Sequence, residues 1–204
     1  MKTEKDILLR RIANHLILHS IDMEDIGLFH GKMGVVLFFA HYARYTDQTI
    51  YDDFAGELLE EICENIPETL PINLETGLCG IGWGIEYLIQ NGFMEGDSNE
   101  ILAVIDQKVM ERDLRRIKDL SLETGLMGIS CYIQSRINMD KQNIPFDNTY
   151  ILEWKLSAIN LQILNTQQII NYLINNIPQD DKILSWNLGI RKGSSGVGLN
   201  MILI

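Results

Sequence analysis

The sequence predicts an all-α fold, built as an arc of about four helical hairpins with inner and outer helices. Two observations support this prediction. First, a glycine-rich turn recurs four times along the 204 residues, each time directly before an apolar segment. Second, the segments that follow the turns are apolar on several sides, whereas the segments between them carry more charge. A helix that is apolar all round belongs inside a fold, and an amphipathic helix belongs on its surface.

The four glycine-rich turns form an internal repeat. The segments "LETGLCGIG" (residues 74–82) and "LETGLMGIS" (122–130) are near copies of each other. "GLFHGKMGVVL" (27–37) begins with the same Gly-Leu pair, and "GIRKGSSGVGL" (189–199) repeats its glycine spacing. The repeat predicts structural turns at Gly27, Gly31, Gly34, Gly77, Gly80, Gly125, Gly128, Gly189, Gly193 and Gly196.

Glycine suits the start of an inner helix for two reasons. It adopts a positive φ in the preceding turn, and it lets crowded helices approach each other closely. Inside a helix a glycine costs ~1 kcal/mol relative to alanine. The repeated glycines therefore imply packing or a function that compensates for this cost.

The helices between the turns follow capping and periodicity signals. An apolar stripe over residues 7–18 predicts the first of them. Strand signals are weak, and "DKILSW" (181–186) is the only short candidate. The predicted N-caps are Thr49 and Ser98, for helices over 50–66 and 99–114. Thr166 is predicted to start a further helix, with the segment 167–177.

The charge and composition exclude several classes of partner. A net charge of -11 argues against binding to nucleic acid or to an anionic membrane surface, because both require basic residues. Three widely spaced cysteines without a CxxC pair do not form a disulfide framework, which favours a reducing cytoplasm. The charged N-terminus does not fit a signal peptide. We expect one cytoplasmic domain over residues 1–204.

The turns "GLFHGKMG", "GLCGIG", "GLMGIS" and "GIRKGSSG" resemble those of the lanthionine synthetase C-like (LanC-like) family. The resemblance extends over nearly the whole chain and implies an α/α toroid, in which the N-termini of the inner helices surround a cavity. It also implies a role in ribosomal peptide modification. The family's cyclases use zinc to activate a peptide cysteine, whose thiol adds to a dehydrated serine or threonine and forms a thioether ring.

The family's zinc is held by two cysteines and one histidine, and this set is incomplete here. His30 stands at the position of the family histidine, which implies a catalytic place for it, but Phe29 stands where the family has cysteine. The family's Trp-Cys pair is absent. We therefore expect no metal site, with zinc bound by His30, Cys79 and Cys131 as the alternative.

The resemblance with an incomplete zinc set implies a truncated or zinc-less cyclase homologue, or an accessory protein that binds a peptide and guides a partner enzyme. The apolar ending "SSGVGLNMILI" (194–204) implies that a partner subunit covers it, as in a homodimer, or that the chain is a fragment of a longer toroid. Two other classes stay open: a carbohydrate-active α/α-toroid enzyme and a helical interaction scaffold without chemistry.

Three residues are candidates for substrate binding. Trp83 and its neighbour Tyr87 could stack against a sugar, although core packing is the more common role of such residues. Glu86 lies in an apolar segment, so it belongs either to a cavity or to an exposed helix edge. Lys192, near the fourth turn, could hold a carboxylate at a cavity mouth or lie in solvent, as could Lys32.

Two further patterns allow more than one interpretation. Glu75 and Glu123 occupy equivalent places before two turns, as a capping feature or as the carboxylate pair of a glycoside hydrolase. A phosphate loop at Gly31 is disfavoured, because no strand precedes it and no serine or threonine follows Lys32.

Overall fold

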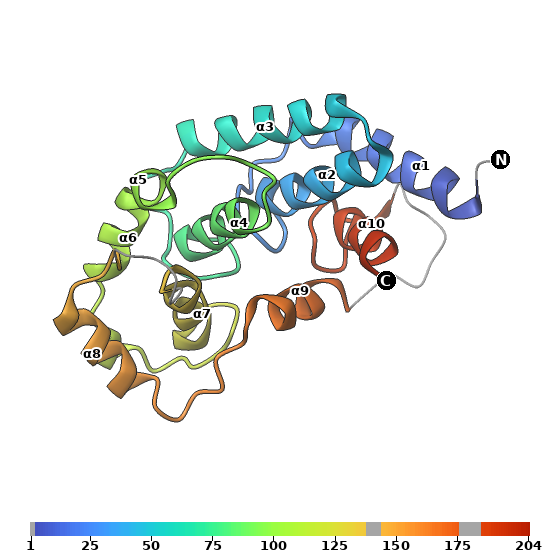
Figure 1. Ribbon diagram of the computed structural model, residues 1–204. Coiled ribbons are helices and arrows are strands. Elements are labelled where there is room, and N and C mark those ends of the chain that lie inside the picture. Colours follow the sequence, from blue (N-terminus) through green and yellow to red (C-terminus); the bar gives the residue numbers. More distant parts are fainter. Residues whose placement is uncertain (1–2, 138–143, 176–184) are drawn as a thin grey trace. The chain divides into compact units, whose positions relative to one another are not determined.

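The computed structural model describes residues 3–137, 144–175 and 185–204 (Figure 1). Within these ranges every regular element is a helix, so the all-α prediction is confirmed. The chain divides into two compact units, which are described separately below. Unit 1 comprises Met1–Glu68 with Ile170–Ile204, and unit 2 comprises Thr69–Ile169. The prediction of one domain over residues 1–204 stays a prediction.

Each unit contains two helices that follow glycine turns, together with more peripheral helices. Unit 1 contains α1 (Glu4–His19), α2 (Lys32–Thr46), α3 (Thr49–Glu64) and α10 (Ser194–Leu203). Unit 2 contains α4 (Leu78–Gln90), α5 (Ser98–Ile101), α6 (Ala103–Met110), the short 3-10 helix η1 (Leu114–Arg116), α7 (Leu126–Arg136) and α8 (Asn148–Ser157). The remaining helix, α9 (Thr166–Ile174), begins in the residue range of unit 2 and ends in that of unit 1.

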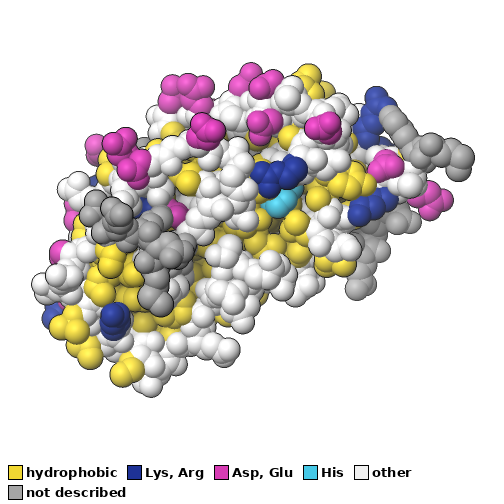
Figure 2. All heavy atoms as spheres, in the orientation of Figure 1, with side chains coloured by type: hydrophobic (Ala, Val, Ile, Leu, Met, Phe, Trp, Pro, Cys, Tyr) yellow, Lys and Arg dark blue, Asp and Glu magenta, His cyan; other side chains and the backbone are white. Residues whose placement is uncertain are grey.

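Unit 1 is organised around α2, which packs against α3 and α10. The residues of α2 are buried without a break from its start through Ala40, as expected for an inner helix. The outer helix α3 buries only one stripe, at Ala55, Leu58 and Ile62. Figure 2 shows acidic side chains gathered along α3, so the predicted contrast between inner and outer helices holds within this unit.

Unit 2 is organised around α4 and α7, which pack against each other (Figure 1). All residues of α4 through Leu88 are buried, including a glutamate. The short helices α5 and α6 contact α4, and α8 contacts η1. The inner pair therefore forms the core of this unit, as α2 and α10 do in unit 1.

Several predicted helix boundaries are wrong. Gln48, not Thr49, precedes α3, and it makes no side-chain cap. Asp97, not Ser98, caps α5, because its carboxylate accepts the amide of Asn99 at 2.8 Å. The helix predicted over 99–114 is interrupted at Leu102, which is fully buried and leaves the helical conformation.

Other predictions about the elements have mixed outcomes. The start of α9 at Thr166 is confirmed, with Asn165 as the residue that exchanges capping hydrogen bonds with Gln168. The helix α8 was not predicted. Of the candidate strand "DKILSW", residues 181–184 lie outside the described residues, and Ser185 and Trp186 are not part of a strand. No helix among the described residues has both the length and the apolar character needed to cross a bilayer.

Candidate functional site at the paired glycine turns

Each inner helix begins at a glycine in the same local structure. Gly31, Gly77, Gly125 and Gly193 are the N-cap residues of α2, α4, α7 and α10. In every case the first helical amide donates to the carbonyl seven residues earlier. These bonds run from Lys32 to Asp25 (2.8 Å), Leu78 to Pro71 (2.8 Å), Leu126 to Asp119 (2.8 Å) and Ser194 to Asn187 (2.7 Å). We call residues 25–34, 71–80, 119–128 and 187–196 the first to fourth glycine turns.

The N-cap glycines are required by close packing of the backbone and not by a positive φ. Gly31 has φ -102° and ψ -171°, an extended conformation open to any residue. A Cβ at Gly31 would lie 2.5 Å from the carbonyl oxygen of Asp25, and one at Gly193 would lie 2.5 Å from that of Asn187. The expectation of positive φ at the turn glycines is therefore wrong, and the expectation of close approach is confirmed.

The alignment of the turns, that is, which residues occupy equivalent positions in them, also differs from the prediction. The shared Gly-Leu pair predicts that Gly27 is equivalent to Gly77, but the equivalent N-caps are Gly31 and Gly77. The residue that corresponds to Gly27 in the second turn is Asn73, whose side-chain oxygen accepts the amide of Thr76 at 2.9 Å. A side-chain cap thus strengthens the second turn where the first has a glycine.

The glycine turns meet in pairs within each unit. In unit 1, the amide of Arg191 in the fourth turn donates to the carbonyl of Phe29 in the first turn at 2.9 Å. In unit 2, the amide of Glu75 donates to the carbonyl of Glu123 at 3.0 Å. The first turn of the chain is therefore joined to the last, and the second to the third.

The turn pair of unit 1 carries three groups that can be cationic, His30, Arg191 and Lys192, which we call the cationic turn pair. The Arg191 guanidinium carbon lies 4.0 Å from the centroid of the Tyr172 ring and 5.8 Å from that of Phe29. Its Nη1 donates to the Tyr172 carbonyl at 3.3 Å. These contacts hold the guanidinium in place, and cation–π attraction adds to them.

The two neighbours of Arg191 in this group differ in exposure. Lys192 is exposed and has a φ of 57°, in the left-handed region. His30 is half-buried, and a Cβ at Gly189 would lie 2.5 Å from its Cα, so the fourth turn crosses close to it. Lys32 does not belong to this group, because it is buried and its ammonium bonds to Glu61 and to the Ile21 carbonyl. The two predicted locations of Lys32, at a cavity mouth or in solvent, are therefore both wrong.

In unit 2, the turn pair places the backbones of Glu75 and Glu123 side by side. The amide of Leu74 also donates to the Glu123 carbonyl, at 3.2 Å. Both glutamate side chains are half-buried. The two residues are thus neighbours, as a carboxylate pair requires, but their role as such a pair stays a prediction.

The donor set that would hold zinc does not fit this metal. Cys79 and Cys131 are buried in unit 2, and burial raises the pKa of both thiols, that of Cys131 to about 11. Zinc binds the thiolate, which this environment disfavours. Among the described residues, no group of three or more His, Cys, Asp and Glu side chains is arranged to hold a metal ion. We therefore assign no ligand role to His30 or to either cysteine.

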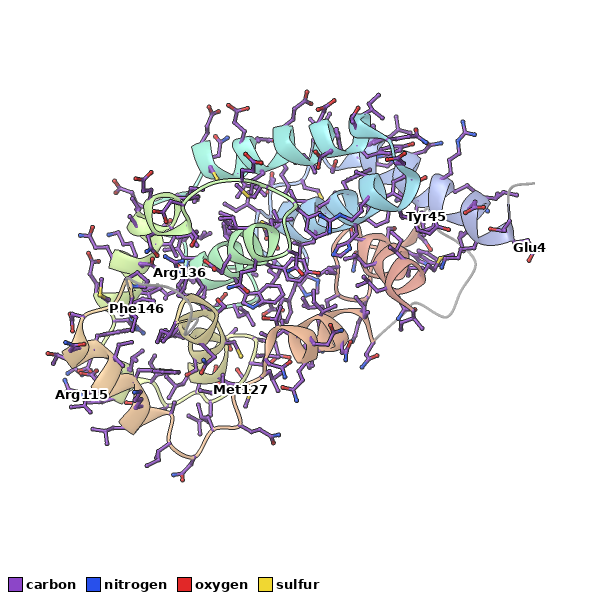
Figure 3. The ribbon with its side chains drawn as sticks, in the orientation of Figure 1. Glu4, Tyr45, Arg115, Met127, Arg136 and Phe146 are labelled. Carbon is purple, nitrogen blue, oxygen red and sulfur yellow. The ribbon has the colours of Figure 1, made fainter. Side chains whose placement is uncertain are left out.

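Glu86 lies in a buried cluster of charges, which includes Asp106, Tyr132 and Arg136. Arg136 Nη1 donates to Glu86 Oε2 at 2.6 Å, and its Nη2 donates to Asp106 Oδ2 at 2.7 Å. The Tyr132 hydroxyl donates to Asp106 Oδ1 at 2.6 Å. Arg136, labelled in Figure 3, is fully buried at the end of α7. We call these four residues the buried arginine cluster.

The charge on Arg136 is maintained by its partners. Burial acts to lower its pKa, but hydrogen bonds to Asp106 and the charges around it raise the pKa above the usual value. Glu86 is thus neither at an exposed edge nor alone in a cavity. Arg136 is not among the site residues predicted from the sequence, in which its only signal is a basic residue at the end of an apolar helical segment. Substrate binding at Glu86 stays a prediction.

Trp83 borders a small cavity of unit 2. Its ring stacks on that of Tyr87, with centroids 5.5 Å apart. The cavity measures about 250 Å³, and the described side chains that line it with Trp83 are uncharged, including Gln90, Gln134 and Asn165. The cavity offers a polar, neutral surface beside one aromatic ring, and Lys192 belongs to the other unit. The joint substrate-binding role of Trp83, Glu86 and Lys192 stays a prediction.

Comparison of the chain with protein-family models, with curated proteins and with solved structures finds no match.

Proposed function

We propose that the chain is a LanC-like protein with an α/α-toroid arrangement, which binds a peptide during ribosomal peptide modification in the cytoplasm. The observation that carries the proposal is the equivalence of the four glycine turns. Each is closed by the same backbone bond and opens an inner helix. Such turns support the resemblance at the level of local structure, beyond the shared letters of the sequence.

The cationic turn pair is the proposed contact with the peptide. Arg191 is oriented by Tyr172 and Phe29, and Lys192 is exposed beside it. The N-termini of α2 and α10 add the positive end of their helix dipoles. A guanidinium held in advance loses little entropy when it binds a carboxylate. The expected ligand is therefore an acidic side chain or a terminal carboxylate of the peptide.

Of the two roles implied by the resemblance, we propose the accessory one, in which the protein presents a peptide to a partner enzyme. The incomplete ligand set supports this choice, since Phe29 stands where the family has cysteine and the family's Trp-Cys pair is absent. The carbohydrate-active alternative has weaker support. The cavity beside Trp83 has no carboxylate among its described lining residues, although a glycosidase requires two.

The test combines metal analysis with peptide binding. Purified, untagged protein is analysed for zinc per chain and for its mass in solution. Little zinc supports the accessory role, whereas about one zinc per chain, lost in His30→Ala, would overturn it in favour of a cyclase.

Binding is measured with a glutamate-rich peptide and its glutamine-substituted counterpart. We expect the acidic peptide to bind more tightly and Lys192→Gln to weaken it several-fold. Lys155→Gln is the matched control, because Lys155 is an exposed cation on α8 with the same charge change. An equal loss of affinity in both variants would mean that binding depends only on the net charge. It would rule out the cationic turn pair as the contact with the peptide.

A further inference from the structure

A second cavity lies in unit 1, away from the glycine turns. It measures about 640 Å³ and is lined by residues of α1, by the last turns of α2 and by the start of α3. Because α2 begins at the first glycine turn, this cavity is at the opposite end of the same helix. Its volume falls within the range of roughly 300–1,000 Å³ that small-ligand sites occupy.

The floor of the cavity is aromatic and rigidly packed. The rings of Tyr42 and Tyr51 have centroids 4.6 Å apart. Behind them, Tyr42 stacks on Phe38 at 5.3 Å with an interplanar angle of 14°, and Tyr51 stacks on Phe39 at 6.1 Å. Of these two rings, Tyr42 is only 4% exposed, so the half-buried ring of Tyr51 is the one that offers surface to the cavity. A planar aromatic ligand gains stacking energy there at little conformational cost.

Among the described residues that line the cavity, Asp6 is the one carboxylate, and it already accepts hydrogen bonds. Asp6 accepts the hydroxyl of Tyr45 at 2.9 Å, together with the amide and the hydroxyl of Thr3 at 2.9 and 2.8 Å. These bonds lower the pKa of Asp6, with the Thr3 amide as the largest cause. Tyr45, labelled in Figure 3, is thereby fixed at the wall beside α1.

Arg10 is the cation among the described residues that line this cavity, and it forms no ion pair with a carboxylate of the described residues. Arg10 lies one turn beyond Asp6 on α1, yet the two form no ion pair, and Arg10 pairs with no other carboxylate in the described part of the chain. It lines the cavity and is exposed. Its guanidinium is therefore the wall group that can receive an anion from solvent.

We propose that this cavity binds a planar aromatic group that carries a carboxylate. The ring lies against Tyr51, which is packed against Tyr42, and the carboxylate bonds to Arg10. The ligand is either a free aromatic acid or an aromatic side chain next to an acidic one in a peptide. Both ligands present an aromatic ring and a carboxylate to the cavity. This proposal is independent of the function proposed for the glycine turns.

The experiment measures binding of small probes to the full chain by calorimetry. The probes are 4-hydroxyphenylacetate, its neutral amide, and an acetylated tyrosyl-glutamate dipeptide amide. We expect the acid to bind about tenfold more tightly than the amide, since a charge-assisted hydrogen bond separates them. A dipeptide that binds more tightly than the free acid identifies a peptide as the source, and the reverse order identifies a small molecule.

Two variants with the same change of charge decide the outcome. Arg10→Gln is expected to remove the preference for the acid over the amide. Arg11→Gln is the control, because Arg11 is the next residue of α1, is exposed and does not line the cavity. The proposal is overturned if no probe binds at millimolar concentration, if Arg10→Gln keeps the preference, or if both variants lose it equally. Both residues are exposed, so neither change is expected to unfold the protein.

Discussion

The amide of Arg191 donates a 2.9 Å hydrogen bond to the carbonyl of Phe29, and this bond joins the last glycine turn of the chain to the first. It connects the N-terminal ends of α2 and α10, and these two helices pack against each other. It also places the guanidinium of Arg191 over the Phe29 ring. The same backbone contact thus supports both the fold of this unit and the cationic surface that we propose for peptide binding.

The close packing of the turns predicts that Gly31→Ala is destabilising. The new Cβ would lie 2.5 Å from the Asp25 carbonyl oxygen, so the turn must shift, at an expected cost of about 1–3 kcal/mol. The measurement is the free energy of unfolding in urea. Gly56→Ala is the control, because Gly56 is on α3 with open space around its Cβ position, and this change is expected to stabilise the protein slightly. Equal effects of the two changes would refute the role of close packing.

The buried arginine cluster predicts a large loss of stability in Arg136→Met. This change leaves the carboxylates of Glu86 and Asp106 buried without their cation, which typically costs about 3–5 kcal/mol. Chemical denaturation of the full chain measures the loss. Arg115→Gln is the comparison, since Arg115 is 69% exposed and its ion pair with Asp113 is at the surface. A loss in Arg136→Met no greater than that in Arg115→Gln would contradict this account of the cluster.

His41 predicts a pH dependence of stability. Burial, together with the charge of Arg44, lowers its pKa from 6.5 to about 4 in the folded chain. The unfolded chain therefore binds a proton between pH 6.5 and 4 that the folded chain does not, so stability falls as the pH falls through this window. Titration of the His41 ring by NMR, with unfolding measured across the window, tests this. A ring that titrates near 6.5 would contradict it, and His41→Gln should flatten the dependence.

The three cysteines are predicted to differ in reactivity. Burial raises the pKa of all three thiols, but Cys63 is exposed to reagents, whereas Cys79 and Cys131 are buried. A thiol reagent should therefore modify Cys63 in the native protein and the other two only after unfolding. Mass spectrometry of the native and the denatured protein counts the modified sites. Rapid native labelling of Cys79 would show that the core of unit 2 opens, and it would reopen the question of a metal site there.

Local signals in the sequence were sufficient to predict the elements that begin at the glycine turns. Gly31 and Gly193 stand directly before apolar segments, and both cap inner helices. The same signals gave the wrong phase for Gly27, because the equivalence of the turns depends on a backbone bond that spans seven residues, and not on the letters at each position. The cap at Asp97 was missed because Ser98 is an equally good capping residue by type.

By itself, the sequence determined the all-helical class, the four glycine turns and the contrast between inner and outer helices, because these depend on residues that are close along the chain. Only the tertiary structure decided which turns meet and which charges pair. Glu86 bonds to Arg136, which is 50 residues away, and Lys32 to Glu61, which is 29 residues away. Such partners are chosen by the packing of helices against each other, and no local pattern specifies them.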